Sequence, residues 1–284
     1  MRTQTADAGT ADAFDLPLTT ALTEPPAKGF ALAANPVPEW PDVLREQIAA
    51  VGLGLRREGL FAAACVILGT VAIVSTDFIY GPVNFPLTPK VGIAPALMAL
   101  FLPMSVWKDE EPSRRGYHHA MPVDHAAHAA ARAAAGLVWM LAALVAFFGW
   151  MGLLALVTGG PVDHAAPWQW LAPFVAASVT YLLGSAVTLV ASRPWRWVGG
   201  GLVGYVFLHA FTGIGVYGLS GPVDALDAVF TGHYGFFTLL FGTISYTADV
   251  LPAQHLPAWL VSVLIWLTVA VGAFAAAAHR QPEA

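Results

Sequence analysis

Histidine is the side chain here best suited to metal chemistry, and four of the nine histidines lie close together. They are His118, His119, His125 and His128, in one polar stretch between two apolar segments. Imidazole nitrogens bind zinc and related metals, usually beside Cys or carboxylate ligands. No Cys accompanies them, and the nearest carboxylate is Asp124. We therefore expect a solvated interface loop, with metal binding as the alternative.

His209 is the clearest histidine inside an apolar segment. Haem held by two histidines needs two of them on facing helices, and His209 has no clear partner. Ionisable groups inside a membrane are costly and often functional. His209 is therefore either a core residue hydrogen-bonded to Tyr205, Thr212 or a neighbouring helix, or part of a translocation path with Tyr205 and Thr212.

Ser220 is the one serine whose neighbours resemble those of a catalytic nucleophile. Gly218-Leu219-Ser220-Gly221 resembles the Gly-x-Ser-Gly of intramembrane serine proteases. Such a serine needs a histidine within hydrogen-bond reach on a later helix. The last apolar segment offers only His279, about 30 Å of hydrocarbon away from Ser220. We expect no catalytic residue in this chain.

The composition indicates a membrane protein. The 284 residues are 57% hydrophobic and 11% charged, with mean hydropathy +0.64. A soluble chain carries about 25% charged residues. A helical span needs about 20 apolar residues. The candidate spans are 60–80, 91–107, 134–158, 168–191, 197–219 and 257–278. The net charge of −5 and the lack of a basic patch exclude nucleic acid as a partner.

Charge asymmetry orients these spans. With the N-terminus inside, twelve of the thirteen Lys and Arg residues are cytoplasmic and only Lys90 lies outside. Both termini are then cytoplasmic, as expected for a multi-pass protein of the inner membrane. Segment 226–250 is polar for a span, and crossing there would place Arg280 outside. We predict that it enters from outside, turns near Gly235 or Gly242, and returns.

The predicted fold is therefore all-α: six transmembrane helices with a re-entrant outer pair at 226–250 before the last span. Residues 1–38 are predicted to be a disordered cytoplasmic tail. Residues 39–58 are predicted to form an interfacial amphipathic helix, with a cytoplasmic extension of the first span as the alternative. The transmembrane domain would cover 59–280. Three outer loops share Gly-Pro-Val-Asn/Asp, beginning at Gly81, Gly160 and Gly221, and we interpret these as turns.

The cytoplasmic loop 108–131 is the most polar stretch between spans. The loop begins with the acidic residues Glu110 and Glu111 and the basic residues Arg114 and Arg115. Pro122 then interrupts the helix, and an Ala-rich helix runs from His125 into the third span. A short helix, a break and a long helix can act as a rigid elbow that transmits force.

Five features follow one another along the chain: an amphipathic helix before the first span, acidic residues followed by Arg114-Arg115-Gly116, then Met121-Pro122-Val123-Asp124, an Ala-rich helix, and re-entrant outer helices. In this order of features the sequence resembles the ABC-2-type permease family of ATP-binding-cassette transporters. The resemblance covers about residues 40–280. The family pattern often has Arg or Lys where this chain has His125 and Ala126.

The resemblance implies that the loop docks on an ATP-hydrolysing subunit. The residues implied in coupling are Glu110, Glu111, Arg114, Arg115, Tyr117, His118, Met121, Pro122, Val123 and Asp124. No Gly-x-x-x-x-Gly-Lys-Ser/Thr stretch occurs, so ATP and Mg²⁺ would be held by that partner and no cofactor by this chain. A second permease copy or a homologue is expected beside it in the bilayer.

The sequence therefore favours the permease subunit of an ABC transporter, with export as the expected direction. Two alternatives stay open: an anchoring or assembly subunit of a larger membrane complex, and a haem-binding electron-transfer subunit.

Overall fold

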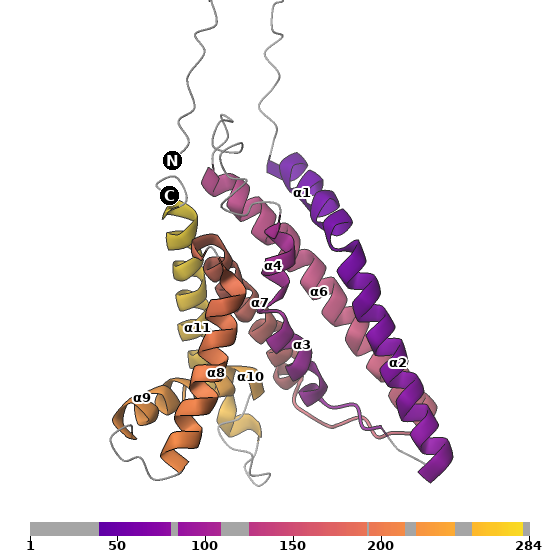
Figure 1. Ribbon diagram of the computed structural model, residues 1–284. Helices are drawn as coiled ribbons and strands as arrows, with labels where there is room; N and C mark the ends of the chain where they lie inside the picture. The colour runs from indigo at the N-terminus through magenta and orange to yellow at the C-terminus, as the bar shows by residue number, and fades with distance from the viewer. Residues whose placement is uncertain are drawn as a thin grey trace, which may run out of the picture. The chain divides into compact units, whose positions relative to one another are not determined.

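The computed structural model describes residues 40–80, 85–108, 125–191, 193–213, 220–241 and 252–280. This part of the chain is helical, and its only β-structure is one isolated bridge (Figure 1). The elements are α1 (Trp40–Gly54), α2 (Arg56–Tyr80), the 3₁₀ helix η1 (Pro89–Gly92), α3 (Ile93–Met98), α4 (Leu102–Val106), α6 (His125–Thr158), α7 (Pro167–Val190), α8 (Pro194–Gly213), α9 (Ser220–Thr231), α10 (Phe236–Phe241) and α11 (Pro252–Arg280). The predicted tail 1–38 lies outside the described residues.

Three helical stretches are long and apolar enough to cross a membrane: Ala126–Thr158, Pro167–Val190 and Leu256–Arg280. They match the predicted spans 134–158, 168–191 and 257–278, and α6 begins at His125 as the Ala-rich pattern predicts. An all-α membrane protein is therefore the fold class. Helices α2 and α8 overlap the predicted spans 60–80 and 197–219, whose crossing stays a prediction.

The segment 91–107, predicted as one span, is instead broken into η1, α3 and α4. Pro103 has no N–H to donate to the carbonyl of Ala99, and its ring crowds that carbonyl. The backbone tightens there: Leu100 N–H donates to the Leu97 oxygen at 3.1 Å, and Phe101 N–H to the Met98 oxygen at 3.0 Å. Pro103 and the tightened turn thus end a helix that, from hydropathy alone, was predicted to continue.

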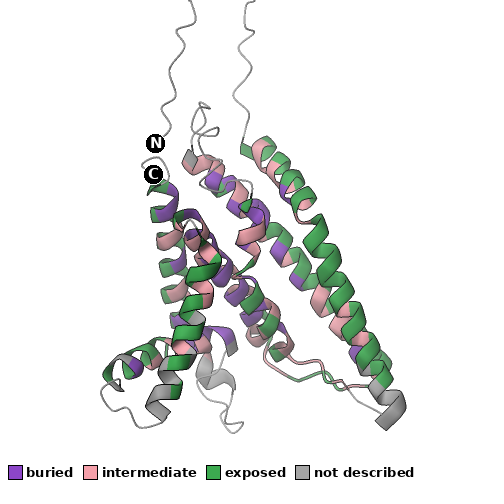
Figure 2. Cartoon of the chain, in the orientation of Figure 1, coloured by how far each residue is buried: buried purple, intermediate pink, exposed green. Residues whose placement is uncertain are grey.

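Helix α7 lies at the centre of the packing and contacts α3, α4, α6, α10 and α11. Its buried face is built mainly from small residues: Ala172, Ala176, Ala177, Gly184, Ser185 and Ala186. Lipid is as apolar as a helix surface, so membrane helices associate by close packing and hydrogen bonds rather than by apolar burial. Figure 2 shows the contrast between the buried face of α7 and the exposed surface of α2.

A hydrogen bond from α7 repairs the break in 91–107. The buried Thr180 hydroxyl donates to the Ala96 carbonyl at 2.7 Å. That carbonyl would accept from Leu100 N–H in a regular helix, but Leu100 bonds Leu97 instead. A buried carbonyl without a partner costs about 1–3 kcal/mol. Thr180 therefore makes the broken conformation tolerable inside the protein.

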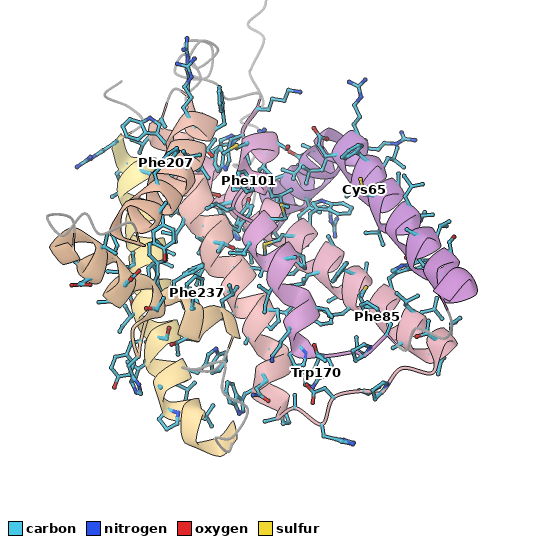
Figure 3. The ribbon with its side chains drawn as sticks, turned by 60° about the horizontal axis from the view of Figure 1, so that its bottom comes forward. Cys65, Phe85, Phe101, Trp170, Phe207 and Phe237 are labelled. Atoms are coloured by element: carbon cyan, nitrogen blue, oxygen red, sulfur yellow. The ribbon has the colours of Figure 1, made fainter. Side chains whose placement is uncertain are left out.

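Helices α1 and α2 follow one another through Leu55 without losing helical hydrogen bonds. Leu55 N–H donates to the Val51 oxygen and Gly59 N–H to the Leu55 oxygen, both at 2.8 Å. Helix α1 packs on α6, where Trp139 Nε1 donates to the Ile48 oxygen at 2.8 Å. Cys65 lies on the exposed surface of α2 (Figure 3).

The two described copies of the Gly-Pro-Val motif have different structures. At Gly160 the chain is extended and bridges Leu87 to Val162, with Asp163 N–H donating to the Leu87 oxygen at 2.9 Å. At Gly221 the same residues fall in the first turn of α9. The first copy, at Gly81, lies outside the described residues. The motif therefore does not specify one conformation.

Candidate functional site

The predicted coupling residues all lie in 109–124, outside the described residues. They are Glu110, Glu111, Arg114, Arg115, Tyr117, His118, Met121, Pro122, Val123 and Asp124. The structure instead describes the two flanks of this loop: α4 with Trp107 and Lys108 before it, and the first turns of α6 after it. We call the junction of these flanks with α7 the loop base, defined by Val106, Trp107, Arg132, Tyr181 and Ser185.

Arg132 joins the two flanks. Its guanidinium Nε and Nη2 both donate to the Val106 carbonyl oxygen, at 3.0 and 2.7 Å. The last carbonyls of a helix have no partner within the helix and carry partial negative charge, so a cation there is stabilising. The same guanidinium lies over the Trp107 ring, 5.8 Å from its centroid. One side chain of α6 thus holds the end of α4.

Buried polar groups surround this contact. Trp107 is 2% exposed, and Tyr181 and Ser185 are 0% exposed. The Trp107 Nε1 and both hydroxyls lack a hydrogen-bond partner. Tyr181 and Ser185 are neighbours one turn apart, and their mutual geometry falls short of a good hydrogen bond. Each such group costs about 1–3 kcal/mol, so close packing must offset it.

The packing at the loop base is tight. A methyl group at Gly136 would overlap the Tyr181 hydroxyl and approach Val106 Cγ2 to 3.2 Å. Glycine at this position lets α6 lie directly against α4 and α7. The loop base is therefore a rigid junction of three helices.

The histidine cluster is only partly described. His118 and His119 lie outside the described residues, as does the side chain of His125, while His128 is half-buried on α6. Within the described ranges, no three His, Cys, Asp or Glu side chains lie where they could hold a metal ion.

Of the predicted translocation residues, Tyr205 is the one whose side chain is described. Its ring packs on Phe230 of α9 with centroids 5.2 Å apart, and its hydroxyl interacts with the Asp227 carboxylate. Tyr205 therefore faces α9. The side chains of His209 and Thr212 lie outside the part that the structure describes.

Sequence reasoning missed Arg132 and Trp107 as a structural pair. Both belong to the polar stretch between the spans, but Arg132 was counted only as a cytoplasmic charge. An arginine eight residues into an Ala-rich helix is the signal that could have identified it. Its partner is a backbone carbonyl, which has no sequence signature.

No protein-family model, curated protein or solved structure matches this chain.

Proposed function

We propose that the chain is the membrane-spanning permease subunit of an ABC transporter of the exporting type, driven by a separate ATP-binding subunit. The observation that carries the proposal is the Arg132 bond to Val106, which ties the end of α4 to the start of α6. A loop whose two ends are bonded together moves as a unit when a partner pushes on it.

Helix packing would carry a movement of the loop into the membrane-spanning helices. Helix α6 continues from the loop for 34 residues, and α4 packs against α7. Packed helices shift as rigid bodies rather than deform continuously. In this proposal the partner binds ATP and Mg²⁺, residues 110–124 touch it, and a second permease copy or homologue completes the path across the bilayer.

Substitutions in and beside the 110–124 loop test this function. Arg115→Glu is expected to weaken binding of the candidate ATPase subunit about tenfold, because a reversed charge opposes a complementary surface. Pro122→Gly softens the loop, and Arg132→Gln removes the guanidinium that bonds Val106. Both are expected to reduce ATP hydrolysis by the assembled complex while leaving the chain folded.

The measurement is complex yield and ATPase rate after reconstitution. Arg193→Glu and Arg193→Gln are matched controls, because Arg193 is an exposed arginine that is neither a predicted coupling residue nor a member of the loop base. Unchanged yield and rate in all three test variants would remove the transporter proposal and favour an anchoring role.

We also propose six crossings, cytoplasmic termini in the inner membrane, and a re-entrant pair at 226–250. In support, α9 and α10 are joined by a turn at Gly232–Gly235, and α10 packs against α11. The Ser262 hydroxyl donates to the Gly235 oxygen at 3.1 Å, which holds this turn against α11.

Cysteine labelling tests this topology in a Cys65→Ser background. A cysteine at Ser113 is expected to react only from the cytoplasm, and cysteines at Asp163 and Gln254 only from outside. The reason is the distribution of basic residues. Labelling of Gln254 from the cytoplasm alone would make 226–250 a true span, and equal labelling of positions 113 and 163 from one side would exclude six crossings.

A further inference from the structure

Helices α1 and α2 follow one another along the chain, but they are packed very differently. Helix α1 is held on α6: Trp139 Nε1 donates to the Ile48 oxygen at 2.8 Å, and Val51 is 4% exposed. A methyl group at Gly52 would overlap the Trp139 ring, so glycine here lets the two helices lie in direct contact. Helix α1 is therefore fixed to α6.

Helix α2 has little such packing. Among its residues whose side chains are described, which are 56–72, 74 and 75, all except Val66 and Thr70 are exposed. None of these residues belongs to the buried core. Apolar residues also surround the helix on every side, instead of forming one stripe that must be covered. Lipid can replace protein beside such a helix at little cost, because both are apolar.

A side-chain hydrogen bond joins α2 to α6 at this narrow contact. Trp150 Nε1 donates to the Thr70 hydroxyl oxygen at 2.8 Å, and that hydroxyl donates to the Val66 oxygen at 2.9 Å. Hydrogen bonds between membrane helices contribute about 0.6 kcal/mol on average and at most about 2 kcal/mol. A bond of this strength favours one position of a helix without preventing another.

Two glycines lie where the fixed helix meets the weakly packed one. Gly54 ends α1, and Gly59 lies in the first turn of α2, on the other side of Leu55. A methyl group at either glycine would meet nothing within 4 Å, so neither is needed for close packing. Glycine is about 1 kcal/mol less favourable than alanine inside a helix, and it allows backbone angles that alanine does not. The two glycines therefore make the backbone at this junction easier to bend.

We propose that α2 is a hinged arm, which turns about Gly54 and Gly59 while α1 stays fixed on α6. The hydrogen bond between Trp150 and Thr70 is the latch of its closed position. Hinges are commonly a few residues at the end of an element, and a difference of a few kcal/mol leaves a second position populated. The proposal concerns this chain alone and does not depend on an ATPase partner.

Spin-label distances in the full chain, in nanodiscs and in a Cys65→Ser background, test the hinge. One pair of labelled cysteines replaces Val74 on α2 and Leu260 on α11, and the reference pair replaces Leu53 on α1 and Leu260. All three positions are exposed, and α2 and α11 lie on opposite sides of the described helices (Figure 1). Double electron–electron resonance is expected to give two distances for the Val74 pair and one for the Leu53 pair.

Two variants remove the latch. Trp150→Phe keeps an aromatic ring without the N–H, and Thr70→Val keeps the shape of the side chain without the hydroxyl. Each variant should raise the population of the second distance about threefold to tenfold. The double variant should raise it no further, because both changes remove the same bond.

Matched controls and a hinge variant complete the experiment. Trp197 and Thr268 are exposed, and the Thr268 hydroxyl donates within its own helix, so Trp197→Phe and Thr268→Val should give the wild-type distances. Adding Gly54→Ala and Gly59→Ala to the Trp150→Phe chain should lower the second population again, because alanine stiffens both positions. The thermal midpoint of each variant verifies folding.

The proposal is overturned if the folded Trp150→Phe and Thr70→Val chains both give the wild-type distances, since the bond then latches nothing. It is also overturned if the distances of the Leu53 pair change as much as those of the Val74 pair, or if the two alanines leave the second population unchanged.

Discussion

Gly184→Ala is expected to lower the thermal unfolding midpoint of the chain in detergent. Gly184 lies on the buried face of α7, against the broken segment between α3 and α4. The added methyl carbon would overlap the Leu100 carbonyl oxygen and lie 3.1 Å from Pro103 Cγ. A backbone oxygen cannot move away by changing a rotamer. Overpacking of this kind costs about 1–3 kcal/mol.

Gly149→Ala is the matched control for this prediction. Gly149 lies on α6, and a methyl group there would meet nothing within 4 Å. Alanine is about 1 kcal/mol better than glycine in a helix interior, so this variant should match or exceed the wild type. Equal midpoints for Gly184→Ala and the wild type would mean that α7 does not pack on Leu100 as closely as the structure has it.

Gly136→Ala is expected to destabilise the loop base by about 1–3 kcal/mol, because its methyl group would overlap the Tyr181 hydroxyl. Tyr181→Phe alone removes a buried hydroxyl that has no partner, so it should be neutral or stabilising. In the double variant the phenyl ring leaves more room for the methyl group. Part of the cost of Gly136→Ala should then disappear.

A double-mutant cycle measures this relief. Unfolding of the wild type, the two single variants and the double variant in detergent is expected to give an interaction energy of about 1 kcal/mol. The Tyr181→Phe chain should keep the bond from Arg132 to the Val106 carbonyl, since the Tyr181 hydroxyl takes no part in it. Strictly additive effects would show that Gly136 and Tyr181 are not in contact.

Helix positions followed closely from apolar content. The predicted spans 134–158, 168–191 and 257–278 correspond to α6, α7 and α11, because about 20 successive apolar residues can only satisfy their backbone in lipid as a helix. Alanine-rich sequence after His125 likewise predicted the start of α6, since alanine has the highest helix propensity. The expectation of one continuous helix over 91–107 was wrong, because hydropathy does not register that Pro103 lacks an N–H to continue the helical hydrogen bonds. Whether the broken segment crosses the membrane stays a prediction.

For the candidate site, too, sequence determined some features and tertiary structure the others. The sequence alone determined where a charged loop interrupts the apolar segments, because charge and hydropathy are properties of residues in order. Only the tertiary structure decided which hydrogen bonds hold the helices together: Arg132 donates to Val106 at the loop base, Thr180 donates to Ala96 at the break in 91–107, and Trp139 donates to Ile48 between α6 and α1. Each of these bonds ends on a backbone carbonyl 26 to 91 residues away. Every residue carries such a carbonyl, so its choice of partner depends on which helices come close enough, and small residues such as Gly136 and Gly184 set that distance.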